Sequence, residues 1–285
     1  MAIMTRPLGR TQADVTILGY GAMELSGLSR GPEIADEDAG RLLNAVLDGG
    51  INLIDTSPDY GRSEELIGRY VGHRRDEFFL ASKCGCLIEL PADALPPYPH
   101  DYSPDNVRAA VEQSLRRLRT DRLDLVQVHM SPDRATLEDH HTVETLQGLR
   151  DEGKVRFIGM SGILPNLPDH LAMNVFDAFQ IPYSAVQRDH EELITEAAGQ
   201  GAGTLIRGGA ARARYRRRRT GGPVRSLRSR AWASGTGTPR ASRTCSPMRA
   251  YPQWSSSSAS PSATRPCRPP SSAPRTRGTW PATSR

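Results

Sequence analysis

Short apolar segments alternate with amphipathic segments from about residue 15 to residue 206, and this repeat constrains the fold of the 285-residue chain more than any other feature. Its period is close to thirty residues, which is the length of a strand, a turn and a helix. Repeated βα units of this kind build a parallel sheet covered by helices. We predict seven strands, at residues 16–23, 52–55, 78–83, 123–128, 155–161, 178–182 and 204–206.

The segments between these strands have the apolar spacing of amphipathic helices. In residues 36–50, Leu43 and Leu47 fall on one face, and two glycines end the segment. In residues 103–121, Ser103 can cap a helix and Pro104 suits its first turn. Both patterns predict helices that cover the sheet.

The order of the units favours one α/β architecture over another. No G-x-G-x-x-G turn follows the first predicted strand, which argues against a doubly wound dinucleotide-binding fold. Repeated βα units without that turn favour a (β/α)8 TIM barrel. Only about seven of its eight units are visible, so we expect an incomplete barrel that forms one domain over residues 1–209.

The composition changes abruptly after Gly209. Residues 211–285 contain 17 of the chain's 37 Lys and Arg residues and none of its 32 Asp and Glu residues, so the preceding part is acidic although the whole chain carries +5. A segment rich in Arg, Ser and Pro, with few Ile, Val or Leu, cannot bury enough apolar surface to fold. We therefore expect residues 210–285 to form a disordered, low-complexity basic tail.

This tail has the composition that out-of-frame reading of a GC-rich gene produces. Arg outnumbers Lys by 35 to 2 in the whole chain. When each codon of residues 242–284 is placed one base later than an underlying frame, the segment can conceal an amphipathic helix, a buried strand and a Thr-Lys turn. We therefore predict a frameshift, a one-base deletion in the gene or its record near codons 209–215. It would remove the last barrel unit and leave the chain as written poorly folded or inactive.

Cysteine usage and hydropathy indicate a reduced, cytoplasmic setting. Cys84 and Cys86 have a C-G-C spacing that is too tight for the usual zinc pairs, so we expect no metal site. The N-terminus lacks the apolar core of a signal peptide, and no segment approaches the roughly 18 apolar residues of a membrane span. Four further histidines lie in loops or at helix starts and are expected to be solvated: His73, His100, His140 and His141.

Four polar residues end predicted strands or follow them, where a parallel barrel places its reacting groups. Asp55, Lys83 and His129 come at or directly after strand ends, and Tyr60 follows Asp55 in the next loop. All four should project into one mouth. A Lys ammonium stabilises a Tyr phenolate, an Asp can hold that Lys, and a His can orient a carbonyl oxygen. The set predicts proton transfer to a carbonyl whose carbon accepts a hydride, which is the reduction of an aldehyde or ketone.

Longer phrases around these residues carry a family resemblance. GYGAM, LDGGINLIDTSPDYGRSEELIG, SKCG, LRRLRTDRLDLVQVH, LRDEGKVRFIGMSG and FQIPYSAVQRDHE follow one another within about residues 7–209, and this sequence resembles the aldo-keto reductases. The resemblance implies that Tyr60 is the general acid, that Asp55 and Lys83 tune it, and that His129 orients a small-molecule carbonyl substrate.

The same resemblance implies a nicotinamide cofactor, more often NADPH than NADH. Side chains at residues 161 and 187 would hydrogen-bond its carboxamide, and the backbone of residues 21–23 would border its ribose. Arg207 stands where the family often has an aromatic residue, and its guanidinium plane could stack on the nicotinamide. The implied cofactor contacts are Gly21, Ala22, Met23, Asp55, Ser161, Gln187 and Arg207.

Two other interpretations stay open. An Arg-rich tail without acidic residues can bind nucleic acid in a non-catalytic protein, but its composition favours the change of reading frame, so we do not expect a nucleic-acid partner. A barrel that binds the cofactor without turnover would act as a sensor. The complete four-residue set favours an enzyme over that alternative. No membrane partner is expected.

Overall fold

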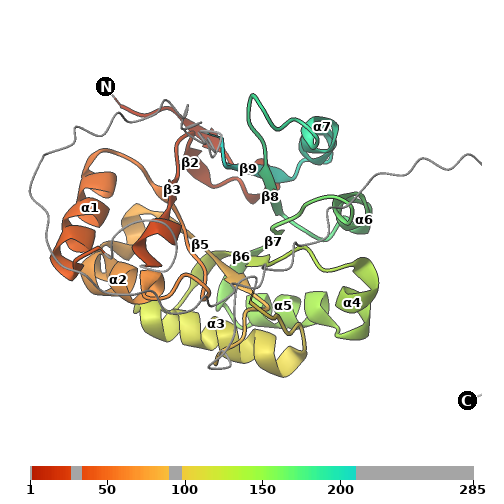
Figure 1. Ribbon diagram of the computed structural model, residues 1–285, viewed down its shortest axis with the longest axis horizontal. Coiled ribbons are helices and arrows are strands. Elements are labelled where there is room, and N and C mark those ends of the chain that lie inside the picture. Colours follow the sequence, from red (N-terminus) through yellow and green to blue (C-terminus); the bar gives the residue numbers. More distant parts are fainter. Residues whose placement is uncertain (1, 27–33, 90–97, 210–285) are drawn as a thin grey trace, which may run out of the picture. The chain divides into compact units, whose positions relative to one another are not determined.

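The computed structural model of the protein describes residues 2–26, 34–89 and 98–209. Within these residues, seven parallel strands form one curled sheet and follow one another in chain order, each paired with the next (Figure 1). This arrangement confirms the predicted incomplete barrel. The tail, residues 210–285, lies outside the described residues. Of residues 209–215, where the frameshift is predicted, only Gly209 is described. The strands are β3 (Tyr20–Gly21), β4 (Leu53–Asp55), β5 (Phe79–Cys84), β6 (Leu123–Val128), β7 (Val155–Met160), β8 (Ala178–Pro182) and β9 (Gly203–Arg207).

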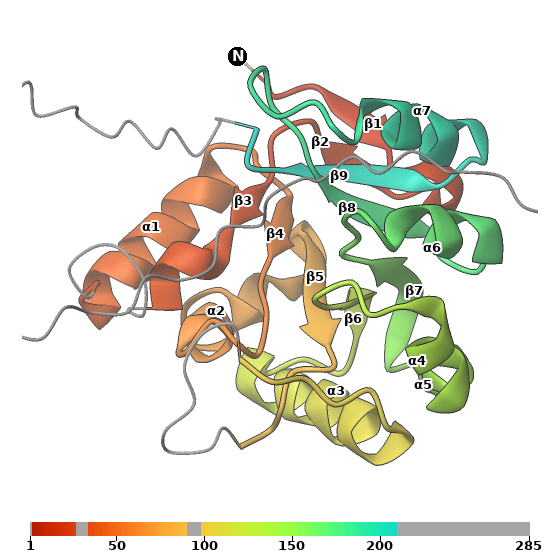
Figure 2. The same ribbon diagram turned by 45° about the vertical axis from the view of Figure 1, so that its right-hand side comes forward.

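Helices cover the outer face of the curl (Figures 1 and 2). They have the predicted amphipathic character, and the side chain of Ser103 caps one of them by accepting a hydrogen bond from the backbone N–H of Asn106. The helices are α1 (Asp36–Asp48), α2 (Ser63–Tyr70), α3 (Pro104–Leu118), α4 (Arg134–Asp139), α5 (Thr142–Asp151), α6 (Leu167–Met173) and α7 (Glu191–Gly199). None of these described helices has the length and apolar character needed to cross a membrane.

The N-terminal part differs from the prediction. The predicted strand over residues 16–23 pairs with the sheet only at Tyr20–Gly21, while β1 (Thr5–Pro7) and β2 (Asp14–Thr16) form a separate antiparallel hairpin. Side-chain bonds end β2: the Thr16 N–H donates to Asn52 Oδ1 at 2.7 Å, and the Thr16 hydroxyl donates to the Leu18 carbonyl at 2.8 Å. The chain therefore leaves β2 before it joins the main sheet.

Two apolar clusters lie on opposite faces of the sheet. The larger one fills the layer between the sheet and the helices and contains Leu43, Val111 and Ile158. The smaller one lies inside the curl, where Leu8 and Leu125 are buried with other inward side chains. Leu8, in the loop between β1 and β2, and Val15, in β2, both belong to this inner cluster. The hairpin therefore packs against the inside of the curl.

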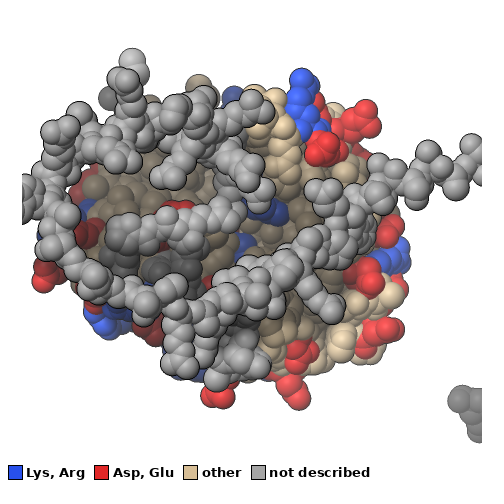
Figure 3. All heavy atoms as spheres, in the orientation of Figure 1, with Lys and Arg blue, Asp and Glu red and all other residues tan. Residues whose placement is uncertain are grey.

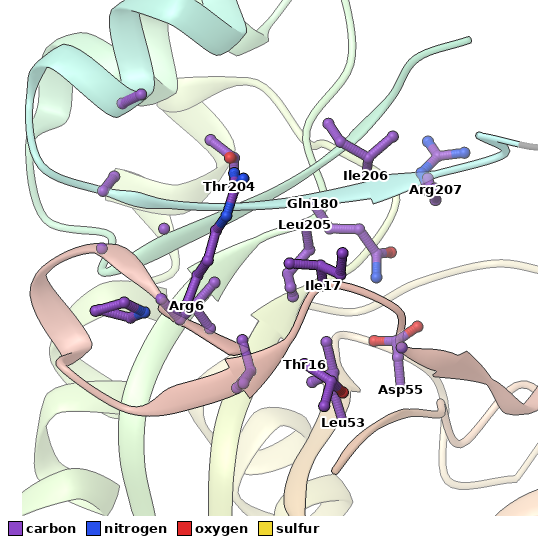
Figure 4. A pocket seen from close by; sticks show the side chains of 18 of the residues that line it. Arg6, Thr16, Ile17, Leu53, Asp55, Gln180, Thr204, Leu205, Ile206 and Arg207 are labelled. Atoms are coloured by element: carbon purple, nitrogen blue, oxygen red, sulfur yellow. The ribbon is translucent and has the colours of Figure 1, made fainter. Parts of the chain in front are cut away.

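The two outermost strands leave the curl open. Among the described residues, β3 pairs only with β4, and β9 pairs only with β8. A cavity of about 670 Å³ lies between these edges, with Leu53 and Asp55 on one wall and residues 204–208 on the other (Figure 4). Ile17 and Ile206 line it and are 60% and 45% exposed. The described sheet is therefore a curl with a gap between its edge strands rather than a closed barrel.

Charged side chains are mixed on the visible surface. Figure 3 shows acidic and basic groups interspersed around the uncovered margin of the described residues, with uncharged residues between them. This margin therefore carries side chains of both signs.

Candidate active site

The alternation of side chains along strands brings the polar residues of the site to the inside of the curl. Residues two apart in a strand share a face. Ala81 and Leu125 belong to the inner apolar cluster, and Lys83 and Gln127 lie two positions further along the same strands. These polar side chains therefore share the inner face, nearer to the carboxyl ends of β5 and β6, where a parallel barrel has its reacting groups.

Lys83 and Asp55 form a buried ion pair at the centre of this arrangement. Lys83 Nζ donates to both carboxylate oxygens of Asp55 at 2.9 Å and to the Thr56 carbonyl at 2.8 Å. Gln127 Nε2 donates to Asp55 Oδ1 at 2.8 Å. Burial alone would lower the pKa of Lys83, but the Asp55 carboxylate outweighs it and the pKa is raised, with a smaller contribution from Tyr60. The ammonium is therefore charged and held in one position.

Tyr60 lies in a turn after β4, beside this pair. Its N–H donates to the Ser57 carbonyl at 3.0 Å, and its own carbonyl accepts from the Ser63 N–H at 2.9 Å, at the start of α2. Lys83 Nζ lies 5.4 Å from the centre of its ring. Burial raises the pKa of Tyr60, and Lys83 counters part of that effect. The hydroxyl is therefore protonated at neutral pH.

His129 follows β6 and is fixed by its backbone. Its N–H donates to the Cys84 carbonyl at 3.0 Å, and its carbonyl accepts from the Tyr102 hydroxyl at 2.8 Å. Its ring lies edge-on to Tyr60, with 6.4 Å between ring centres. Burial lowers the pKa of His129, so the imidazole is neutral at neutral pH. A neutral imidazole can donate one hydrogen bond without carrying a charge.

A second cavity, of about 470 Å³, brings the predicted catalytic residues together. Asp55, Tyr60 and His129 line it, and Lys83 is buried behind Asp55 with 1% of its surface exposed. The two cavities share four residues from four strands, which are Gly21, Asp55, Gln180 and Arg207. The site is therefore continuous with the open edge of the sheet.

Most of the predicted cofactor contacts also line this second cavity: Gly21, Met23, Asp55, Ser161 and Arg207. Ala22 is fully buried instead, and its carbonyl accepts from the Ser63 hydroxyl at 3.0 Å.

Gln187 is absent from the residues that line the second cavity. It is exposed in a turn beyond the end of β8, where its backbone bonds with that of Ser184 at 3.0 and 3.1 Å. Gln180, inside β8, lines both cavities and accepts from the Ser161 hydroxyl at 3.4 Å. The structure therefore puts Gln180, rather than Gln187, beside Ser161. A polar residue within the apolar run FQIP was the available signal.

His100 corrects another expectation. We expected four solvated histidines, and His73, His140 and His141 are exposed. The His100 side chain is only 7% exposed, with Nε2 3.2 Å from Asp59 Oδ2 and 3.2 Å from His129 Nδ1. Asp59 and His100 belong to the surroundings of His129, and sequence reasoning missed both.

Comparison with known sequences gives a family match over most of the chain. The profile described as the Aldo/keto reductase family matches residues 17–244. L-galactose dehydrogenase of Arabidopsis thaliana is 35% identical over 170 residues, covering 56% of this chain and 49% of that protein. NADH-specific methylglyoxal reductase of Escherichia coli is 29% identical over 201 residues, covering 65% of this chain and 60% of that protein. The chain thus spans about half to three-fifths of the length of these relatives.

Solved structures agree with this match. The holo form of an aldo-keto reductase from Bacillus halodurans has a TM-score of 0.66 and 31% identity, covering 74% of this chain and 68% of that one. Glycerol dehydrogenase from Gluconobacter oxydans has a TM-score of 0.58 and 31% identity, covering 72% of this chain and 62% of that one. By sequence and by fold, this chain belongs to the aldo/keto reductase family of oxidoreductases.

Proposed function

We propose that this protein reduces an aldehyde or ketone to an alcohol with NADPH, and that Asp55, Tyr60, Lys83 and His129 carry out the reaction. The observation that carries the proposal is the buried Lys83–Asp55 pair beside Tyr60, in a cavity that His129 also lines. A charged ammonium, a protonated hydroxyl and a neutral imidazole in one mouth are the groups that carbonyl reduction needs.

Each residue has a distinct role in this proposal. His129 donates a hydrogen bond that orients the carbonyl oxygen, and Tyr60 transfers its proton to that oxygen. Lys83, 5.4 Å from the ring centre, stabilises the phenolate that remains. The Asp55 carboxylate holds the Lys83 ammonium in position, and Gln127 holds that carboxylate by donating a hydrogen bond to it. The residues act in a partly buried cavity, where such interactions are stronger than in water.

The cavity residues fit a nicotinamide ring. Ser161 and Gln180 offer a hydroxyl and an amide side by side, which can pair with a carboxamide. Gly21 has no side chain at the cavity edge, and an added Cβ there would meet open space. The bound cofactor would supply the hydride. We propose Gln180, in place of Gln187, as the second carboxamide contact.

NADPH rather than NADH is part of the proposal, and one relative is named as NADH-specific. The test is to assay the purified full-length chain with each cofactor. L-galactose and methylglyoxal occur in the names of relatives, so small polar carbonyl compounds are the first substrates to try. Faster turnover with NADH than with NADPH would contradict the cofactor preference.

Tyr60→Phe tests the catalytic assignment. We expect kcat to fall by about 100-fold or more, because general acid catalysis contributes on that scale, while cofactor affinity stays nearly constant. Tyr70→Phe is the matched control, since Tyr70 ends α2 and is absent from the residues lining the two cavities. An unchanged kcat in Tyr60→Phe would refute the assignment. Cofactor binding without turnover in both the parent chain and a frame-restored chain would instead support a sensor.

The change of reading frame also stays a proposal. It is supported by the composition of residues 210–285 and by the open edges of β3 and β9 among the described residues. Resequencing the gene across codons 206–242 tests it, and an unaltered reading frame would refute it. We further propose a cytoplasmic setting, in which the buried thiols Cys84 and Cys86 stay reduced.

A further inference from the structure

Three side chains converge on the ring of His129 and form with it a cluster of four. The four residues lie on the connections after β4, β5 and β6, with Cys86 and His100 on the same one, and one ligand atom from each lies within 4.8 Å of the others. All four are largely shielded: the side chains of Asp59, His100 and His129 are 9%, 7% and 13% exposed, and Cys86 is fully buried. The cluster consists of Asp59, Cys86, His100 and His129.

The spacing within this cluster is that of ligands around one ion. His129 Nδ1 lies 3.2 Å from His100 Nε2, 3.3 Å from Asp59 Oδ2 and 3.4 Å from Cys86 Sγ. His100 Nε2 lies 3.2 Å from Asp59 Oδ2. A tetrahedral Zn²⁺ site with bonds of about 2.0–2.3 Å separates its ligand atoms by about 3.3–3.6 Å. These four separations agree with that range to within about 0.2 Å, and all six pairs of ligand atoms lie within 4.8 Å.

The orientation of His100 is a second, independent observation. Its Nδ1 lies 2.8 Å from the Tyr98 carbonyl oxygen, which can only accept, so Nδ1 carries a proton and donates it. In neutral His100, the lone pair on Nε2 then faces Asp59 Oδ2 at 3.2 Å. Two acceptors at this distance need a donor proton or a cation beside them, and His129 Nδ1 lies 3.2–3.3 Å from both. Histidines that bind metals commonly donate their other N–H to a backbone carbonyl in this way.

We propose that Asp59, Cys86, His100 and His129 bind one divalent metal ion, preferentially Zn²⁺. One thiolate, two imidazoles and one carboxylate are the donors that Zn²⁺ takes in four-coordinate sites. On binding, Cys86 loses its thiol proton to solvent and Asp59 binds as a carboxylate. The site differs from the C-G-C pair considered in the sequence, because only Cys86 of that pair takes part. His100 lies further along the same connection after β5 and bridges to Cys86, while Asp59 and His129 follow β4 and β6.

The metal would also determine the tautomer of His129. When Nδ1 binds the ion, the remaining ring proton of the neutral imidazole is on Nε2, which becomes the only donor of the ring. The ring would then be fixed with a donor available to a carbonyl oxygen. This effect on His129 rests on the proposed reductase function, whereas metal binding itself does not.

Metal titration of the full-length protein tests the proposal without cofactor or substrate. After chelator treatment, Co²⁺ should bind with one equivalent per chain and give the visible absorption of a tetrahedral site with a thiolate charge-transfer band. Zn²⁺ should displace the Co²⁺, and competition with a chromophoric chelator then gives its affinity. His100→Ala and Cys86→Ser should each weaken Zn²⁺ binding by more than about 100-fold, since loss of outer-sphere partners alone costs about 10–100-fold.

Matched controls separate the cluster from other ligands in the chain. Cys84→Ser removes the neighbouring buried thiol, and His73→Ala removes an exposed imidazole, and both should bind Zn²⁺ as the parent does. If the cluster variants unfold by circular dichroism, the thiolate band of a chain with Cys84→Ser, Cys245→Ser and Cys267→Ser, in which Cys86 is the one remaining thiol, decides the question. Absence of that band, or parent-like Zn²⁺ affinity in folded His100→Ala and Cys86→Ser, would overturn the proposal and leave a hydrogen-bonded cluster only.

Discussion

Replacing Lys83 by Met should destabilise the protein by an amount that the structure defines. The substitution keeps a similar side-chain length and removes the ammonium, which makes three hydrogen bonds of 2.8–2.9 Å. Breaking one partner of a buried ion pair costs about 3–5 kcal/mol. The Asp55 side chain is 19% exposed and keeps the hydrogen bond from Gln127, so we expect the free energy of unfolding to fall by about 3 kcal/mol, the lower end of this range. That loss corresponds to a fall in Tm of about 6–12 °C for a domain of this size.

Urea unfolding of Lys83→Met, Asp55→Asn and the double variant measures this effect. Asp55→Asn removes the carboxylate, so the double variant leaves no buried charge and should recover part of the stability lost in Lys83→Met, because replacing both members of a buried pair is often nearly neutral. The reasoning would be refuted if Lys83→Met lowered the free energy of unfolding by less than about 1 kcal/mol. It would also be refuted if the losses of the two single variants simply added up in the double variant.

Three further predictions concern stability and solubility. Burial raises the pKa of Glu64 above 4.5, so the stability that protonated Glu64 contributes is fully present below pH 4.5 and is lost as the pH rises through the raised pKa. Tm should therefore decline over that pH range, and Glu64→Gln should make the decline less steep; an equally steep decline in the variant would contradict the prediction. Gly68→Ala would place a Cβ 2.1 Å from the Arg117 carbonyl oxygen and should cost about 1–3 kcal/mol in urea unfolding. Gly148→Ala, whose helical Cβ would make only an ordinary contact of 3.6 Å with an Arg108 side-chain nitrogen, should not be destabilising. Ile206 is 45% exposed on the edge strand β9, and Ile206→Lys should lower light scattering on concentration; equal scattering would argue against aggregation through this edge.

The sequence predicted most of the sheet because its strands are short apolar runs between turn residues. The predicted strand at residues 123–128 coincides with β6, and that at 178–182 coincides with β8. The prediction was wrong where side chains compete with backbone pairing, as at Thr16, and it missed the β1–β2 hairpin because each of its strands has three residues. Length and local bonding therefore limited the prediction more than hydropathy did.

The site was predictable where the strand rule applied and not where loops meet. Asp55 and Lys83 were predicted because a polar residue ends an apolar strand. Gln180 lies in the middle of β8, where a polar residue within an apolar strand is the corresponding signal. Asp59 and His100 have no such signal, since their contact with His129 depends on the path of two loops. Sequence spacing does not encode that path, so the cluster appears only in the folded chain.

The division of the site between central and edge strands has a consequence for function. Lys83 lies on β5, which is paired with a strand on both sides, so the Lys83–Asp55 pair of the proposed catalytic set is held by the interior of the sheet. Gly21 and Arg207, which border the proposed nicotinamide site, lie on β3 and β9, each of which is paired on one side among the described residues. Edge strands open at lower free energy than strands paired on both sides. In this chain the open edge should therefore weaken cofactor affinity more than it disturbs the geometry of the Lys83–Asp55 pair.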